Sequence, residues 1–202
     1  IQRKDIRIGD TVVIHRAGDV IPEVVKVIKE KRKADSQEYK LPIFCPSCKS
    51  DAVRELGDAV LRCENRTACP AQIKGRMKHF VSKNCMDIDG IGDKLIESLI
   101  HNKLINRYSD IFNLSYADLE NLDRMGEKSI NNILDSINKS KKTEFSRFLN
   151  GLGIRNIGTH ACKLLEKKFK SDINMLSVAS EKDLNDIHEI GEIMASSIID
   201  YF

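Results

Sequence analysis

The spacing of apolar residues along the chain changes near residue 70, from a period of two to a period of three to four. Residues 11–16 and 20–28 alternate like β-strands, and the residues 17–19 between them are typical of a turn. Pro22 removes a ladder donor, so we expect it at an edge or a bulge. From Pro70, which suits the first turn of a helix, apolar residues recur at helical spacing to the end. The pattern predicts a β-rich start followed by an all-α region.

A repeat organises the helical region. Four glycines follow one another at intervals of 34, 32 and 33 residues, and each has an apolar residue four places before, one place before and seven places after it. The glycines are Gly92, Gly126, Gly158 and Gly191; the apolar residues are, in the order given, Ile88, Leu122, Ile154 and Ile187, then Ile91, Met125, Ile157 and Ile190, then Leu99, Ile133, Leu165 and Ile198. The pattern predicts four tandem helix-hairpin-helix units.

The repeats are expected to pair, two plus two. The sequence Ser109-Asp110-Ile111 before the second glycine is echoed by Ser171-Asp172-Ile173 before the fourth, and Asp118-Leu119 is similarly echoed by Asp183-Leu184. A helix is also predicted before the first unit, and its apolar face consists of Ile73, Met77, Phe80 and Val81.

The glycine turns suggest binding of phosphate groups. A glycine at the start of a helix lets a ligand approach the backbone, and the first helical N–H groups are unpaired donors at the positive end of the helix dipole. Such contacts would hold a duplex without reading its bases. The alternative is that each glycine only makes a tight turn between packed helices. The residues we expect to contact DNA are Gly90, Gly92 and Lys94, then Arg124, Gly126 and Lys128, then Arg155, Gly158, Thr159 and Lys163.

The fourth turn differs from the other three. It carries Glu189 and Glu192 where a phosphate would lie, so we expect it mainly to pack.

Four cysteines have the spacing of zinc ligands. Cys45 and Cys48 form C-x2-C, and Cys63 and Cys69 follow as C-x5-C after fourteen residues. Four thiolates suit tetrahedral Zn²⁺ and leave no open position, which predicts a structural site. A hairpin turn at Gly57-Asp58 would bring the two pairs together. The alternative, four unliganded thiols, is disfavoured because a segment of about 25 residues with so few apolar groups needs a metal to fold.

The other two cysteines, Cys85 and Cys162, lie alone in helical surroundings, and we expect them to be core thiols. A secreted disulfide framework would spread its cysteines differently.

Composition and the absence of certain motifs narrow the classes of function that the chain could have. With 33 Lys and Arg against 30 Asp and Glu, the net charge of +3 permits nucleic-acid binding without demanding it. No apolar run approaches the roughly 20 residues that span a bilayer, which predicts a cytoplasmic protein with no membrane partner. The basic run 29–33 is interpreted as a solvated face. No nucleotide-binding glycine loop and no catalytic triad is recognisable, which favours a binding platform.

Several stretches resemble bacterial NAD+-dependent DNA ligases. They are 16–25 (RAGDVIPEVV), the cysteine quartet with Pro70-Ala71-Gln72, 78–82 (KHFVS), 86–94 (MDIDGIGDK) and 147–155 (RFLNGLGIR). The resemblance covers the chain in order and implies a multidomain α+β protein. Its parts would be the C-terminal part of an OB-fold domain at 1–40, a four-cysteine zinc finger at 41–70 and a helix-hairpin-helix domain at 71–202. It also adds Arg16 to the expected DNA-binding residues.

The resemblance implies a place in nick sealing. In that family a lysine in a Lys-x-Asp-Gly motif takes AMP from NAD+ in a Mg²⁺-dependent enzyme, passes it to the 5′-phosphate of a nick, and the 3′-hydroxyl displaces it. No such motif occurs here. We therefore expect a fragment, without the adenylation or BRCT domains, that binds nicked duplex DNA as a monomer and does not seal it. It would serve replication and repair at the bacterial nucleoid.

Two other classes remain open at this stage. One is a recombination or repair mediator that joins a zinc finger to helix-hairpin-helix motifs. The other is a protein-interaction module, since paired helical repeats also dock partners.

Overall fold

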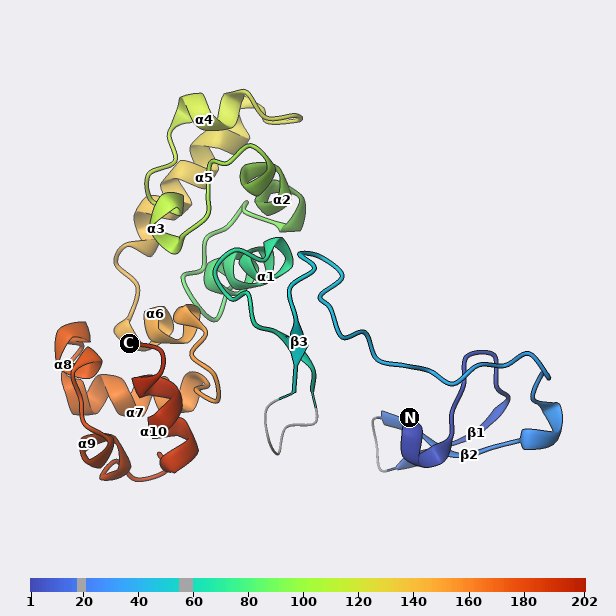
Figure 1. The fold of residues 1–202 in the computed structure, drawn as a ribbon. Coiled ribbons are helices and arrows are strands. Elements are labelled where there is room, and N and C mark those ends of the chain that lie inside the picture. Colours follow the sequence, from blue (N-terminus) through green and yellow to red (C-terminus); the bar gives the residue numbers. More distant parts are fainter. Residues whose placement is uncertain (18–20, 55–59) are drawn as a thin grey trace. The chain divides into compact units, whose positions relative to one another are not determined.

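The computed structural model describes residues 1–17, 21–54 and 60–202, which divide into two compact units (Figure 1). Unit 1 is Ile1–Glu64 and unit 2 is Asn65–Phe202. The turns expected at Gly18-Asp19 and Gly57-Asp58 lie outside the described residues. The domain boundaries expected after residues 40 and 70 stay predictions.

The described part of unit 1 contains two short antiparallel pairs of strands. Its elements are a 3-10 helix Gln2–Lys4, β1 (Val12–Ala17), β2 (Ile21–Val27), a 3-10 helix Lys29–Lys31, β3 (Ala52–Val53) and β4 (Arg62–Cys63). Strand β1 pairs with β2, with a register shift between Val13 and Ile14, and β3 pairs with β4. Pro22 lies opposite Arg16 near one end of its pair. The strands predicted from alternation are therefore confirmed.

Apolar burial is sparse in unit 1. Among its apolar residues whose side chains the structure describes, only Cys45 is buried. Ile14 and Ile21 on the β1–β2 pair are 56% and 72% exposed. Because burial of apolar area is the main favourable term in folding, polar contacts must contribute an unusually large share of the stability of unit 1.

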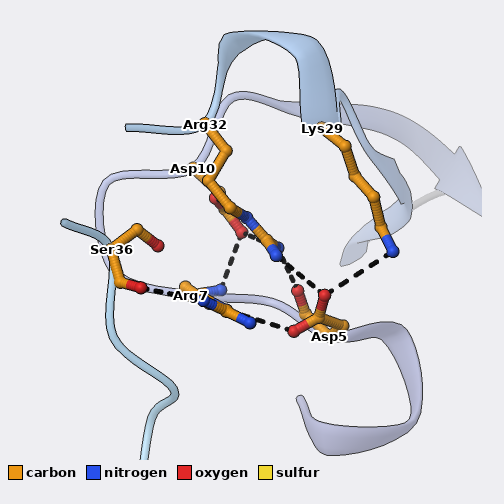
Figure 2. Close-up of polar contacts among 6 residues, drawn as sticks. All are labelled: Asp5, Arg7, Asp10, Lys29, Arg32 and Ser36. Carbon is orange, nitrogen blue, oxygen red and sulfur yellow. Dashed lines mark hydrogen bonds and ion pairs between the residues drawn. The ribbon is translucent and has the colours of Figure 1, made fainter. Parts of the chain in front are cut away.

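Arg32 is the centre of those polar contacts (Figure 2). Its guanidinium donates to the carboxylate of Asp5 at 2.7 Å and to both carboxylate oxygens of Asp10 at 2.8 Å. The Arg32 side chain is only 12% exposed and that of Asp10 only 2%. Reading the run 29–33 as a solvated face is therefore wrong for Arg32, because its charge is paired with two carboxylates from the start of the chain.

Further contacts extend this network on both sides. The Arg7 side chain donates to the carbonyl of Ser36 at 2.8 Å and to the Asp5 carboxylate at 3.2 Å. Lys29 places its ammonium 3.6 Å from the same carboxylate (Figure 2). The network thus ties the segment before β1 to the segment after β2, at a sequence separation that composition alone does not reveal.

Unit 2 is entirely helical in its regular structure. Its helices are α1 (Pro70–Val81), α2 (Asp93–His101), α3 (Tyr108–Ile111), α4 (Tyr116–Glu120), α5 (Glu127–Ser140), α6 (Phe145–Leu152), α7 (Thr159–Phe169), α8 (Ile173–Ser177), α9 (Glu181–Asn185) and α10 (Glu192–Ile199). Pro70 is the first residue of α1, as expected, and the predicted apolar face of that helix is buried. No helix among the described residues is long and apolar enough to cross a membrane.

Two apolar cores lie within unit 2, one for each pair of repeats. The first core gathers buried residues between Ile73 and Ile137, and the second gathers buried residues between Leu149 and Ile198. All the apolar positions predicted around the four glycines are buried except Met125, which is half-buried and packs against the first core. Figure 1 shows α2–α5 and α7–α10 as separate groups, with α1 and α6 side by side between them. The predicted two-plus-two pairing is confirmed.

The short helices are held at their starts by side-chain caps. The Ser115 hydroxyl and the Asp118 carboxylate cap α4 reciprocally, and Ser180 and Asp183 do the same for α9. The echo between the two halves is less complete one element earlier. Asp110 is the third residue of α3 and accepts from backbone N–H groups that precede that helix, so the same sequence serves two different cap geometries.

The corresponding residue of the second half, Asp172, comes directly before α8. Its carboxylate accepts from the N–H groups of Asn174 and Met175 inside the helix.

The Arg32 network predicts the titration of Asp5. Hydrogen bonds from Arg32 and then from Arg7 lower the pKa of the Asp5 carboxyl from 3.8 to about 2. Because this pKa is depressed in the folded state, the contact contributes stability above about pH 4 and loses it as the pH falls toward about 2. Carboxyl-carbon NMR titration should show Asp5 titrating near 2 in the native chain and at a clearly higher pH in Arg32→Gln, still below 3.8 because the Arg7 hydrogen bond remains. Lys29→Gln is the control and should leave the titration nearly unchanged; equal effects of both variants would contradict this assignment.

Candidate metal centre and nucleic-acid interface

The first two cysteines lie on a tight backbone turn. The N–H of Cys45 donates to the carbonyl of Ser50 at 2.7 Å, and the carbonyl of Cys45 accepts from the N–H of Lys49 at 2.9 Å. Lys49 closes the turn with a φ of 63°. This geometry directs two thiols from one short segment toward the same point, as C-x2-C ligand pairs require.

The structure brings the four predicted cysteines together. Their Sγ atoms all lie within 4.8 Å of one another, and those of Cys48 and Cys63 are 3.4 Å apart. A zinc tetrahedron with Zn–S bonds of about 2.3 Å needs sulfur separations of about 3.8 Å, so the donor set fits Zn²⁺ in number, type and spacing. Cys45 and Cys69 are 7% and 1% exposed. Four sulfur ligands would fill the coordination shell, which suits a structural metal and excludes a bound catalytic water.

Local hydrogen bonds favour the thiolate form that a metal needs. The hydroxyl and the backbone N–H of Ser50 lower the pKa of the Cys48 thiol from 9.0 to about 6. Backbone N–H groups of Cys48 and Ser47 lower the pKa of the Cys45 thiol. Since a coordinating cysteine must lose its proton, these donors reduce the proton release that accompanies metal binding at neutral pH.

The fourth ligand is tied to the start of a helix. Cys69 is the N-cap residue of α1, and its carbonyl accepts the first helical hydrogen bond, from the N–H of Ile73, at 2.9 Å. Pro70 then occupies the first helical position, where a missing N–H costs nothing. The Cys-Pro order thus fixes where the metal loop ends and where α1 begins.

The remaining cysteines behave as predicted. Cys85 and Cys162 have no exposed surface. Burial raises the pKa of the Cys162 thiol to about 11, so it stays protonated and apolar in the second core.

The four repeat glycines occupy the same structural position. Each is the N-cap of the second helix of its repeat, with φ between −88° and −98° and extended ψ. The helices that they begin are α2, α5, α7 and α10. The four turns are therefore one conformation used four times, as the sequence register predicted.

The left-handed residue of each turn lies two places earlier. It is Gly90 in the first turn, with φ 88°, followed by Arg124 (63°), Asn156 (63°) and Glu189 (72°) in the others. Sequence reasoning missed this feature, because arginine and glutamate give no sign of a positive φ. The available signal for a positive φ was the residue type of Gly90 and Asn156, since glycine and asparagine adopt that region readily.

The N-cap glycines are not required by the fold itself. A Cβ added to any of the four would meet no atom within 4 Å, and their φ values are ones that any residue adopts. Gly90 is the opposite case, since its φ is positive and an added Cβ would lie 2.6 Å from Cγ1 of Ile133. The two kinds of glycine in the first turn thus have separate reasons to be glycine.

The predicted basic side chains around the turns are exposed. They are Lys94, Arg124, Lys128, Arg155 and Lys163 in unit 2, and Arg16 on β1 in unit 1 is exposed as well. Thr159 is the first residue of α7, the one glycine-started helix with no acidic residue in its first turn. In the first turn, the acidic Asp93 is paired with Lys78 at 2.7 Å, which lowers the pKa of that carboxyl.

The fourth turn directs its acidic group toward the third repeat. Glu189 places a carboxylate oxygen 3.0 Å from Nε2 of His160, the second residue of α7. A second oxygen lies 3.5 Å from Nδ1 of His188. That this carboxylate disfavours a phosphate at the fourth turn stays a prediction.

Comparisons with known proteins agree with this arrangement. Residues 1–36 match the family model of the NAD-dependent DNA ligase OB-fold domain, and residues 44–71 match that of the NAD-dependent DNA ligase C4 zinc finger domain. Residues 84–139 match a SAM-like helix-hairpin-helix tandem, and residues 147–202 match a helix-hairpin-helix motif. The fold class predicted from the sequence is thereby confirmed, and the four-cysteine cluster is a structural Zn²⁺ site.

Proteins named DNA ligase match along the whole chain. Those of Desulfosudis oleivorans, Nitrosococcus oceani and Halothermothrix orenii are 46%, 47% and 48% identical to it over 202 residues. The chain spans 30% of the length of each of these relatives. The helix-hairpin-helix motifs and the zinc finger indicate DNA binding.

The metal site predicts a localised effect of removing one ligand. Cys48→Ser should reduce bound zinc from about one ion per chain to a small fraction, because a three-thiolate site loses both charge and geometry. Hydrogen exchange should then quicken across the described residues 44–54 and 60–64, while protection of the helices in the two apolar cores stays near the native level. Metal analysis and exchange mass spectrometry measure both effects.

Ser47→Ala is the matched control, because the group of Ser47 that hydrogen-bonds the Cys45 thiol is its backbone N–H, which alanine keeps. It should retain its zinc. Melting of α2–α10 together with the loss of zinc would contradict the view that the helical cores are independent of the metal.

Proposed function

We propose that this chain, which belongs to the NAD-dependent DNA ligase family, is the part of such an enzyme that holds a nicked DNA duplex by its phosphate backbone. The parent enzyme would join a 5′-phosphate to a 3′-hydroxyl during replication and repair, in the bacterial cytoplasm at the nucleoid. NAD+ and Mg²⁺ would act at the adenylation site of that enzyme, outside this chain. The chain itself would bind DNA as a monomer and would not seal it.

The observation that carries the proposal is the openness of the four N-cap glycines. Neither backbone strain nor packing requires glycine at Gly92, Gly126 or Gly158, yet the sequence has glycine at each. A missing side chain at a helix start leaves the first N–H groups open to a close-approaching anion. A repeated phosphate backbone is the ligand that suits such donors presented several times in one domain.

The turns are proposed to differ in their contribution. The first three combine an open glycine with exposed basic side chains, at Lys94, Lys128 and Lys163. In the first turn Lys78 also neutralises Asp93, so this acidic group does not repel a phosphate there. The fourth turn has Glu189 and Glu192 in the corresponding places and is proposed mainly to pack against its neighbour.

The zinc finger is proposed to have a supporting role. Its four thiolates fill the coordination shell, so it supplies no catalytic group. Its position between the β-rich and helical segments of the chain suits a module that holds both to one duplex, with Arg16 as a further phosphate contact. The proposed DNA contacts are Gly90, Gly92, Lys94, Arg124, Gly126, Lys128, Arg155, Gly158, Thr159, Lys163 and Arg16.

Electrostatic binding predicts a definite dependence on salt. If the chain neutralises about four phosphates, the logarithm of the association constant should fall with a slope of roughly −3.6 against the logarithm of salt concentration. Fluorescence anisotropy with nicked and intact duplexes of the same sequence, at several salt concentrations, measures the slope and any preference for the nick. A slope near zero, or no binding to either duplex, would favour a protein-interaction module instead.

Replacing the glycines tests which turns contact DNA. Gly126→Ala and Gly158→Ala should lower the free energy of unfolding by less than about 1 kcal/mol, because alanine adds no clash and costs only its weaker preference for the N-cap. Each should weaken duplex binding about tenfold, because a hydrogen bond to a charged group contributes about 1.5–3 kcal/mol.

Two glycines provide matched controls for this series. Gly191→Ala should leave both affinity and stability nearly unchanged, since the fourth turn is proposed only to pack. Gly90→Ala should lower the stability, because its φ is positive and its Cβ would clash with Ile133. Equal losses of affinity at residues 126 and 191 would contradict the proposed ranking of the turns.

A further inference from the structure

The two pairs of repeats meet at a joint between the first helix of each pair. This joint, defined here as the α1–α6 joint, consists of α6 and of the end of α1 with the segment 82–87 that follows it. The covalent connection between the pairs is the short segment 141–144 between α5 and α6. Noncovalent contacts at the α1–α6 joint therefore decide whether the pairs move together.

Side chains of α6 satisfy the backbone that follows α1. The carbonyls of Lys83 and Cys85 accept from the Arg147 guanidinium, the latter at 3.0 Å, and the carbonyl of Asn84 accepts from the Asn150 amide at 3.3 Å. Arg147 also lies 3.3 Å from a carboxylate oxygen of Asp87. Three consecutive carbonyls beyond the end of a helix are thus occupied by one partner helix, where they would otherwise need water or a cap.

Side chains of the first pair of repeats also donate hydrogen bonds to the backbone of α6. His79 of α1 donates from Nε2 to the carbonyl of Asn150 at 2.7 Å, and the Tyr108 hydroxyl donates to the carbonyl of Leu152 at 3.1 Å. Both carbonyls lie in the last turn of α6, and that of Asn150 accepts in addition from the N–H of the C-cap residue Gly153. Each half therefore completes the hydrogen bonding of the other half at a helix end.

Close packing accompanies the hydrogen bonds. A Cβ added at Gly151 would lie 3.1 Å from the ring of Phe80 and 3.4 Å from Cβ of Cys85, so α6 approaches α1 as closely as a residue without a side chain allows. The Phe80 ring stacks on Tyr108 with centroids 4.4 Å apart. Asn150 is 7% exposed and its amide also lies 3.2 Å from Sγ of Cys85. The contact has directional hydrogen bonds and little free volume, which favours one fixed orientation.

We propose that the α1–α6 joint fixes the two pairs of repeats as one rigid platform, so that turns from both pairs bind the same duplex at once. His79, Arg147 and Asn150 are then positioning residues that contact no DNA. The inference rests on the proposed function, and it adds that the affinity depends on the orientation between pairs. Two sites held at a fixed separation bind as one bivalent ligand, and loss of that preorganisation costs affinity without removing any contact.

The test compares long and short duplexes with the whole chain. A duplex of about 20 base pairs can span both pairs, whereas one of about 8 base pairs, roughly 27 Å long, offers room for one pair. The native chain should bind the long duplex at least about tenfold more tightly than the short one. Arg147→Lys with Asn150→Ala keeps the net charge but removes the forked guanidinium and the amide that donate to the three carbonyls, since one lysine ammonium does not reproduce that geometry. This variant should lose at least about threefold in that ratio while its affinity for the short duplex stays unchanged.

A contact variant and a folding measurement separate the possible causes. Lys128→Ala should weaken binding to any duplex that the second turn contacts and reduce the salt slope by about one, which the joint variant should not do. Circular dichroism checks that the double variant is folded; if it is not, the single variant Arg147→Lys carries the test, with a smaller loss in the ratio.

An unchanged ratio in a folded variant would overturn the joint proposal while the proposed function stands. Failure of the native chain to bind either duplex would overturn the proposed function and this inference together.

Discussion

The helical unit depends on apolar anchors placed at fixed distances from each glycine turn. Helices of four or five residues, such as α3, α4, α8 and α9, cannot persist alone in water because nucleating a helix costs more than one turn returns. They persist here because each buries an apolar residue of its own in the core that the positions around the glycines also enter; these residues are Ile111, Leu119, Leu176 and Leu184. That constraint determines the direction of every helix that follows a turn, and so it determines which backbone groups face solvent.

The turns keep conformational strain and ligand access at different residues. The positive φ that reverses the chain is carried two places before the N-cap, where Arg124 and Glu189 adopt it against their preference. The N-cap glycine is left with ordinary dihedral angles and open space. Neither a clash nor strain therefore requires glycine at the N-cap, which leaves two reasons for it, the preference of helix starts for glycine and the close approach of a ligand from outside.

Unit 1 is stabilised by other means than the helical unit. With almost no buried apolar side chain among its described residues, it depends on charge pairs around Arg32 and, through Cys45, Cys48 and Cys63, on the thiols gathered for a metal. The stabilisation that each gives depends on solution conditions: on pH for the carboxylate ion pairs and on metal concentration for the thiolates. The helical unit depends instead on apolar burial, which responds to neither.

Much of the fold followed from the sequence because its signals are periodic or local. The register of Gly92, Gly126, Gly158 and Gly191 recurs at a nearly constant interval, and the C-x2-C pair and the alternation in β1 and β2 each lie within a short window. The structure confirmed all of them. The Arg32 network was missed because its partners lie more than twenty residues away, and a basic run looks the same whether or not carboxylates return to meet it.

The contacts of the α1–α6 joint could not be predicted from local patterns in the sequence. Arg147 and Asn150 are polar residues on a helix with a clear apolar face, and nothing nearby in the sequence distinguishes them from solvated side chains. Their partners are backbone carbonyls about 65 residues earlier, which carry no residue-type signal at all. The repeats specify each pair by themselves, but the angle between pairs comes from hydrogen bonds that no repeat contains. If two pairs of repeats hold one duplex, the part of the sequence that is least repetitive therefore decides how they act together.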